Sequence, residues 1–197
     1  MAMNFKIFND KEAVSAYAAD LLRKQVHSNK NSVLALENHK DLEWTYEKFV
    51  GEIKRYPADL SQVYITTVNN DGDISILNKL SIPSGQFYTD GKEGSLEHIL
   101  KDKKAVNLAL LYLDKDSKLG FTQSINNELL FGAREIVIAA SGKESAEAVK
   151  DLYNASENNA GGYSSVKSHR MVTVVLDTEA AAELDEDIKE YYSYKFA

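Results

Sequence analysis

The chain alternates between short runs of consecutive apolar residues and longer segments in which apolar residues recur every third or fourth position. A short continuous apolar run is typical of a strand that is buried on both faces of a sheet. Spacings of three and four are typical of a helix with one apolar face. The pattern predicts strands over residues 5–8, 32–36, 63–68, 105–113, 136–140 and 171–176.

Helices are predicted between these strands. The first follows Asn9 or Asp10, both good N-cap residues, and should end near residues 29–31. Others are predicted around residues 44–53, 96–100 and 143–153, while residues 74–80 alternate only weakly before Pro83 and Gly85. Repeated strand–helix units imply right-handed crossovers. We therefore predict an α/β fold, a three-layer, mostly parallel, Rossmann-like sheet with helices on both faces, in a single domain over residues 1–197.

The amino-acid composition excludes several kinds of chemistry and some cellular locations. The chain has enough apolar residues, 44% of the total, to form a core without metals or disulfides. It contains no cysteine, which excludes disulfides, thiol nucleophiles and cysteine-ligated metals. Its first residues lack the pattern of a signal peptide, and no apolar run approaches the roughly 18 residues of a membrane span. We expect a cytoplasmic protein with no membrane partner.

The charge of the chain argues against one class of partner. Its net charge is -7, its pI is about 5.2, and no dense Lys/Arg cluster interrupts this acidity. Such a surface repels a polyphosphate backbone. Nucleic-acid binding is therefore not expected.

Ligands of open parallel sheets bind beyond the carboxyl ends of the strands, so the loops at those ends carry the candidate chemistry. The loop over residues 37–41 lies between a strand and a helix, a position that suits phosphate binding by backbone amides. It lacks glycine and carries Glu37 and Asp41, with His39 and Lys40 as the only compensation. A lone loop histidine is more often a solvated surface residue than a catalytic one.

Two further loops follow predicted strands. The turn over residues 69–73 offers Asp71 as a general base, although a plain Asx/Gly turn explains the same residues. The loop over residues 114–118 brings two carboxylates and two amines together, and a solvated turn would look the same.

The order of these loops resembles that of a known family. Residues 34–42, LALENHKDL, are similar to L-G-L-P-T-G-G-T-P, residues 142–145, GKES, to G-x-x-K, and residues 164–169, SSVKSH, to S-x-L-Q-x-H. These are motifs of the glucosamine-6-phosphate deaminase/isomerase and 6-phosphogluconolactonase family, and the likeness extends over about residues 5–184. It places His39 and Lys40 at two phosphate-cradling glycines. The substrate-binding positions it implies are Asn38, His39, Lys40, Lys143 and Ser145.

The same comparison implies that the catalytic residues are missing. Residues 67–71, TVNND, resemble N-M-D-E-Y and place Asn69 at the base position, where an amide cannot act, unless the loop shifts and Asp71 substitutes. Residues 111–121, LYLDKDSKLGF, resemble G-G-x-G-x-D-G-H-I-A-F and keep Asp116 but place Lys118 at the ring-opening histidine. The family's lid between residues 121 and 124 is also missing.

The resemblance therefore implies a shortened, divergent family member of carbohydrate metabolism, catalytically impaired, that binds a sugar phosphate or a similar anion without a metal or redox cofactor. One alternative is an active amino-sugar-phosphate isomerase/deaminase or lactonase. Another is a non-catalytic interaction or scaffold protein, such as a homo-oligomer, for which the aromatic residues 191–196 offer a contact surface. A terminal helix packed on its own domain would explain that segment equally.

Overall fold

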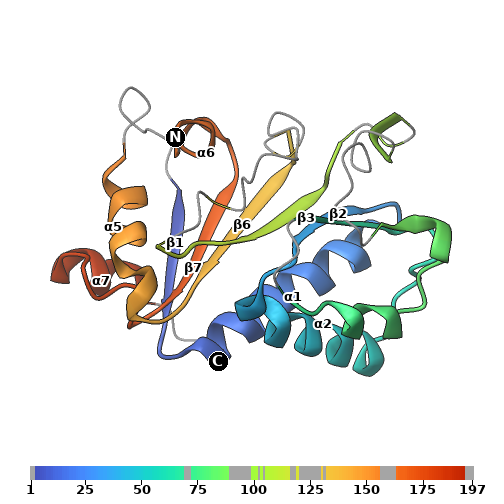
Figure 1. Ribbon diagram of the computed structural model, residues 1–197, viewed down its shortest axis with the longest axis horizontal. Helices are drawn as coiled ribbons and strands as arrows, with labels where there is room; N and C mark the ends of the chain where they lie inside the picture. Colours follow the sequence, from blue (N-terminus) through green and yellow to red (C-terminus); the bar gives the residue numbers. More distant parts are fainter. Residues whose placement is uncertain are drawn as a thin grey trace.

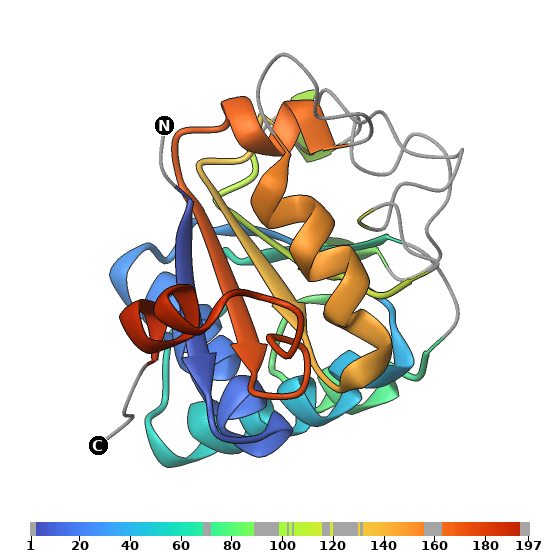
Figure 2. The ribbon, with the colours of Figure 1, turned by 90° about the vertical axis from the view of Figure 1, so that its left-hand side faces the viewer.

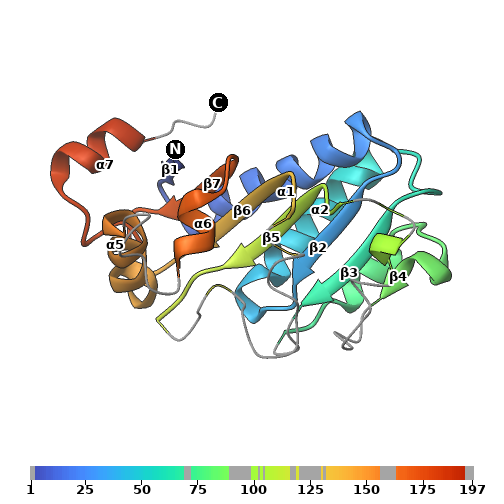
Figure 3. The ribbon, with the colours of Figure 1, turned by 90° about the horizontal axis from the view of Figure 1, so that it is seen from above.

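The sheet contains seven strands, all parallel (Figure 1). The structure is a computed structural model that describes residues 3–68, 72–88, 99–101, 103, 105–115, 119, 130, 132–155 and 163–193. The strands are β1 (Asn4–Phe8), β2 (Val33–Glu37), β3 (Tyr64–Val68), β4 (Phe87–Tyr88), β5 (Leu108–Tyr112), β6 (Glu135–Ala140) and β7 (Val172–Asp177). Figure 3 shows them side by side in the order β1-β7-β6-β5-β2-β3-β4. The predicted parallel α/β sheet is confirmed.

Helices cover both faces of this sheet. The first face carries α1 (Lys11–Ser28) and α2 (Glu43–Arg55), whose buried residues share one apolar cluster with β2, β3 and β5. The opposite face carries α5 (Ala146–Asn154) and α6 (Ser164–Ser168), which belong to a second cluster (Figure 2). Asp10 caps α1 as predicted, because its side chain accepts from the Ala13 amide at 2.8 Å. In the described part of the chain, no helix is long and apolar enough to cross a membrane.

The structure differs from the sequence prediction between residues 72 and 88. The weakly alternating segment is a 3-10 helix, η2 (Ser75–Lys79), in which Leu77 is buried, as are Ile74 and Leu80 on either side of the helix. Another short turn, η3 (Ser84–Gln86), leads into β4, which the sequence did not predict. A spacing of three between buried residues fits a 3-10 helix, which has three residues per turn.

The strand order places a topological switch point between β2 and β5. From β2 the chain builds outward through β3 and β4, and it then returns to β5, beside β2, and builds the other way through β6 and β7. β2 and β5 pair from Leu34 with Leu108 to Leu36 with Leu110. A crevice beyond the carboxyl ends of two such strands is the usual ligand site of an open parallel sheet.

The last helix packs against the edge of the sheet. α7 (Glu186–Tyr192) lies beside β1, with the rings of Phe5 and Tyr192 5.5 Å apart and a single bridge between Ile7 and Ser193. Tyr191 is 80% exposed. Tyr192 therefore packs on its own sheet while Tyr191 stays exposed, and residues 194–197 lie outside the described residues, so the contact surface over residues 191–196 stays a prediction.

Candidate functional site

The carboxyl ends of β2 and β5 are joined by a buried carboxylate. Glu37, the last residue of β2, is 1% exposed, and its Oε2 accepts from the Tyr112 amide of β5 at 2.6 Å. The Tyr46 hydroxyl of α2 donates to the Glu37 carbonyl oxygen. Glu37 thus joins the ends of two strands to a helix. Its carboxylate accepts a backbone hydrogen bond, so it is not a free acid of the loop that follows β2.

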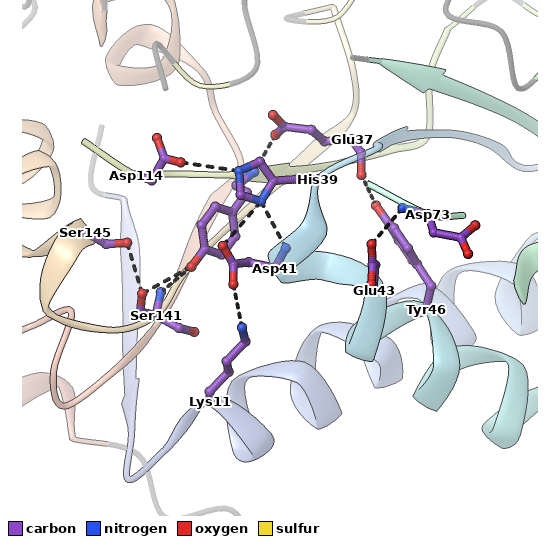
Figure 4. Close-up of polar contacts among 11 residues, drawn as sticks. Lys11, Glu37, His39, Asp41, Glu43, Tyr46, Asp73, Asp114, Ser141 and Ser145 are labelled. Atoms are coloured by element: carbon purple, nitrogen blue, oxygen red, sulfur yellow. Dashed lines mark hydrogen bonds and ion pairs between the residues drawn. The ribbon is translucent and has the colours of Figure 1, made fainter. Parts of the chain in front are cut away.

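His39 is the central side chain of the site (Figure 4). It is 5% exposed, and its ring stacks on that of Tyr112 with the centroids 4.4 Å apart. Its Nδ1 accepts from the Asp41 amide at 3.2 Å, so the proton of the neutral ring lies on Nε2, which is 3.3 Å from an oxygen of Asp114. The interpretation of His39 as a solvated loop residue is wrong, because the ring packs between β2 and β5.

An ion pair between Asp41 and Lys11 extends the contacts of His39 to the helix that follows β1. The Asp41 carboxylate lies 2.6 Å from Lys11 Nζ and 3.7 Å from His39 Nδ1. Lys11, Asp41, His39 and Asp114, which we call the Lys11–Asp114 network, therefore connect the segments that follow β1, β2 and β5. Lys11 was not predicted from the sequence, since the contact joins residues thirty positions apart and nothing in the local pattern marks it.

Tyr112 connects the network to the loop after β6. Its hydroxyl donates to the Ser141 carbonyl at 3.1 Å and accepts from the Ser141 amide at 3.2 Å. Burial, and then the nearby Asp41 carboxylate, raise the pKa of Tyr112 well above its ordinary value. The hydroxyl therefore stays protonated at neutral pH and serves as a fixed hydrogen-bonding group.

A second buried carboxylate holds the start of the next helix. Asp177, at the end of β7, is 4% exposed, and both its oxygens lie 3.0 Å from the Gly142 amide. It also accepts from the Ala180 amide at 2.7 Å. Gly142 has φ 79°, a conformation that favours glycine, and precedes η4 (Lys143–Ser145). The Gly142 amide, just beyond the end of β6, is therefore bound to a carboxylate of the same chain, that of Asp177.

The predicted substrate-binding residues differ in exposure. Ser145 is 1% exposed, and its hydroxyl donates to the Ser141 carbonyl, so it supports the loop. Asn38 is 6% exposed and its Oδ1 has no hydrogen-bond partner among the described residues. By contrast, Lys40 in η1 (Lys40–Leu42) and Lys143 in η4 are exposed. No ion pair of either lysine is found within the part of the chain that the structure describes.

The candidate catalytic positions Asn69, Asp71, Asp116 and Lys118 lie outside the described residues, as does the segment where the lid was expected to be missing. Their interpretation stays a prediction. Gly72 is described, and it lies directly against the backbone of His39 and Lys40. The loops after β2 and β3 are therefore packed together at this edge.

His169 has a structural role away from this site. Its Nε2 lies 2.7 Å from the Ala133 carbonyl and its Nδ1 accepts from the Met171 amide at 3.1 Å. Both contacts are at the amino ends of β6 and β7, at the edge of the sheet opposite His39. The best local sequence match, residues 164–169, thus supports the fold. Among the described residues, no group of three His, Asp or Glu side chains is arranged to hold a metal ion.

A parallel sheet with this strand order, helices on both faces and polar side chains at the carboxyl ends of its central strands defines the class. The chain has the fold of the superfamily that includes glucosamine-6-phosphate deaminases and 6-phosphogluconolactonases, and the resemblance predicted from its loops is confirmed. No protein-family model matches the sequence.

Individual relatives agree with this class. Glucosamine-6-phosphate deaminase of Alkaliphilus oremlandii (strain OhILAs) is 24% identical over 234 aligned positions, which cover 88% of this chain and 96% of the relative. Since the alignment is longer than the 197 residues of this chain, the relative contains segments that this chain lacks.

Solved structures share the fold. A monomeric glucosamine-6-phosphate deaminase has a TM-score of 0.77 at 16% identity, covering 91% of this chain and 99% of its own. A 6-phosphogluconolactonase from Trypanosoma brucei has a TM-score of 0.69 at 14% identity, covering 93% and 99%.

Proposed function

We propose that this chain binds a sugar phosphate or a similar small anion at the carboxyl edge of β2, β5 and β6 and does not convert it. The similarity to a glucosamine-6-phosphate deaminase supports the ligand class. The proposal adds that the catalytic function of such enzymes has been lost here. Anion binding and the loss of catalysis are supported by different side chains.

The state of His39 is the observation that carries the loss of catalysis. A general acid or base must reach the proton that it transfers. Both ring nitrogens of His39 are engaged, one by a backbone amide and the other by Asp114, and the ring is buried on Tyr112. Tyr112 itself stays protonated. The sequence resemblance also implies that Asn69 and Lys118 replace the family's base and its ring-opening histidine. On this proposal, the carboxyl edge of the sheet has lost the family's proton-transfer groups.

Two exposed lysines support binding. Lys40 follows β2 and Lys143 follows β6, with β5 between those strands. Neighbouring strands are about 4.8 Å apart, so the two loops start roughly 10 Å from each other. A hexose phosphate is of similar length. One such ligand is therefore long enough to reach from one of these loops to the other.

Ligand-induced thermal shifts test this proposal. The chain is titrated with glucosamine 6-phosphate, fructose 6-phosphate and 6-phosphogluconate, and at least one should raise the unfolding temperature. The double variant Lys40→Gln/Lys143→Gln should lose most of that shift. Lys54→Gln is a matched control, because Lys54 is also exposed but lies in the last turn of α2, at the opposite edge of the sheet. If none of the three compounds stabilises the unaltered chain, the proposal is wrong.

A further inference from the structure

The Lys11–Asp114 network contains two hydrogen-bond donors, Lys11 Nζ and His39 Nε2–H, that each face a carboxylate of the same chain. Lys11 Nζ lies 2.6 Å from Asp41, and His39 Nε2 lies 3.3 Å from Asp114. The side chains of Lys11, Asp41 and Asp114 are 38%, 29% and 23% exposed, whereas that of His39 is 6% exposed, so the two carboxylates lie between solvent-exposed surface and the donors they contact. They also lie at the switch point between β2 and β5, where open parallel sheets bind ligands (Figure 4).

We propose that Lys11 and His39 are further anion-binding groups at the same edge as Lys40 and Lys143, and that Asp41 and Asp114 occupy them in the absence of ligand. This inference rests on the proposed function and adds two donors to the site at which the anion binds. A phosphate or phosphate ester accepts from Lys11 Nζ and from His39 Nε2–H, as the two carboxylates do now. The chain is therefore self-inhibited, with its own carboxylates in the place of the ligand.

The self-inhibition has two physical sources. Each carboxylate competes for the same donors, and it does so as part of the same chain, at a high effective concentration. A carboxylate that has been displaced but remains nearby also repels the incoming anion, since unit charges a few ångströms apart at a protein surface interact appreciably. Both effects vanish when the carboxylate is replaced by an amide of the same shape. Anion affinity should then rise.

Inorganic phosphate is the probe, measured by isothermal titration calorimetry on the full chain. Asp41→Asn and Asp114→Asn should each bind phosphate about tenfold more tightly than the unaltered chain, or about 1.4 kcal/mol. Adding Lys11→Gln to Asp41→Asn should cancel that gain.

A matched control is Asp20→Asn. It makes the same change of charge at a lysine–carboxylate pair, Lys24 with Asp20. Asp20 is nine residues further along α1 than Lys11, about 14 Å at the rise of an α-helix. The control should leave phosphate affinity unchanged.

Several results would overturn the inference. Equal phosphate affinity in the unaltered chain, Asp41→Asn and Asp114→Asn would do so, as would an equal gain in Asp20→Asn. If Asp114→Asn does not fold, Asp41→Asn decides alone, because it keeps the His39–Asp114 contact. Thermal unfolding without phosphate confirms that each variant is folded.

The inference and the proposed function can fail separately. If sugar phosphates bind through Lys40 and Lys143 but the Asn variants gain nothing, the function stands and the self-inhibition is wrong. If only the Asn variants bind phosphate, the self-inhibited site stands and the unaltered chain does not have the proposed function.

Discussion

Gly72 is the residue at which a single added methyl group should most clearly disturb the site. A Cβ at this position would lie 2.7 Å from the backbone carbon of His39, 2.7 Å from the backbone nitrogen of Lys40 and 3.0 Å from Asn38 Oδ1. Contacts below 3.0 Å with backbone atoms are not relieved by rotating a side chain. Gly72→Ala must therefore push the loops after β2 and β3 apart.

The cost follows from the size of this clash. Forcing extra methyl groups into a packed region costs typically about 1–3 kcal/mol of unfolding free energy. For a chain of 197 residues, each kcal/mol lowers Tm by about 2–4 °C. Urea unfolding followed by circular dichroism measures the free energy, and a thermal scan measures Tm. We expect Gly72→Ala to unfold at lower urea and at a Tm lower by several degrees.

Gly51→Ala is the matched control. Gly51 lies inside α2, and a Cβ there would meet no atom within 4 Å. Alanine is a better helix former than glycine, so this variant should gain about 0.5–1 kcal/mol. The same chemical change should thus have opposite signs at the two positions. Equal stability of Gly72→Ala and the unaltered chain would refute the packing of the two loops described above.

Three further variants test single contacts. Tyr112→Phe removes the hydroxyl from the Ser141 amide and carbonyl and should cost about 1–3 kcal/mol in urea unfolding, whereas an unchanged midpoint would contradict its bridging role. Asp177→Asn should cost about 1.5–3 kcal/mol, because an amide is a weaker acceptor for the Gly142 N–H, and hydrogen exchange at Gly142 should accelerate. At Asp20, burial favours a higher pKa, but hydrogen bonds and charges from Lys24 and Arg23 outweigh it and lower the pKa below 3.8. A lowered pKa stabilises the fold above the unfolded value and is lost as pH falls through the folded value. Asp20→Asn should therefore lose less than about 1 kcal/mol at pH 7 and progressively less as the pH falls below 3.8, and a loss that does not shrink in acid would contradict this.

The buried strands and the amphipathic helices were predictable because their signals are local. Val14, Ala18, Leu22 and Val26 recur at a spacing of four and are all buried in α1. β4 was missed because it has only two residues, too few for any pattern. Residues 74–80 were misinterpreted because a spacing of three is easily mistaken for weak alternation when the segment is short.

The edge of the sheet that carries the site was predictable, but its contacts were not. Parallel strands place their carboxyl ends together, which directed attention to residues 37–41 and 114–118. The contact between His39 and Asp114 depends on β5 lying beside β2, and this strand order could not be predicted from the sequence. The Asp177 carboxylate on Gly142 depends in the same way on β6 lying beside β7.

Incubation of the purified chain with glucosamine 6-phosphate tests the central proposal most directly, when binding is followed by calorimetry and ammonia release is followed in the same sample. The proposal predicts saturable binding with no ammonia above the level of a protein-free control. Ammonia release that follows enzyme concentration and is abolished by Asp71→Ala would contradict it, and would show that the chain is an active deaminase.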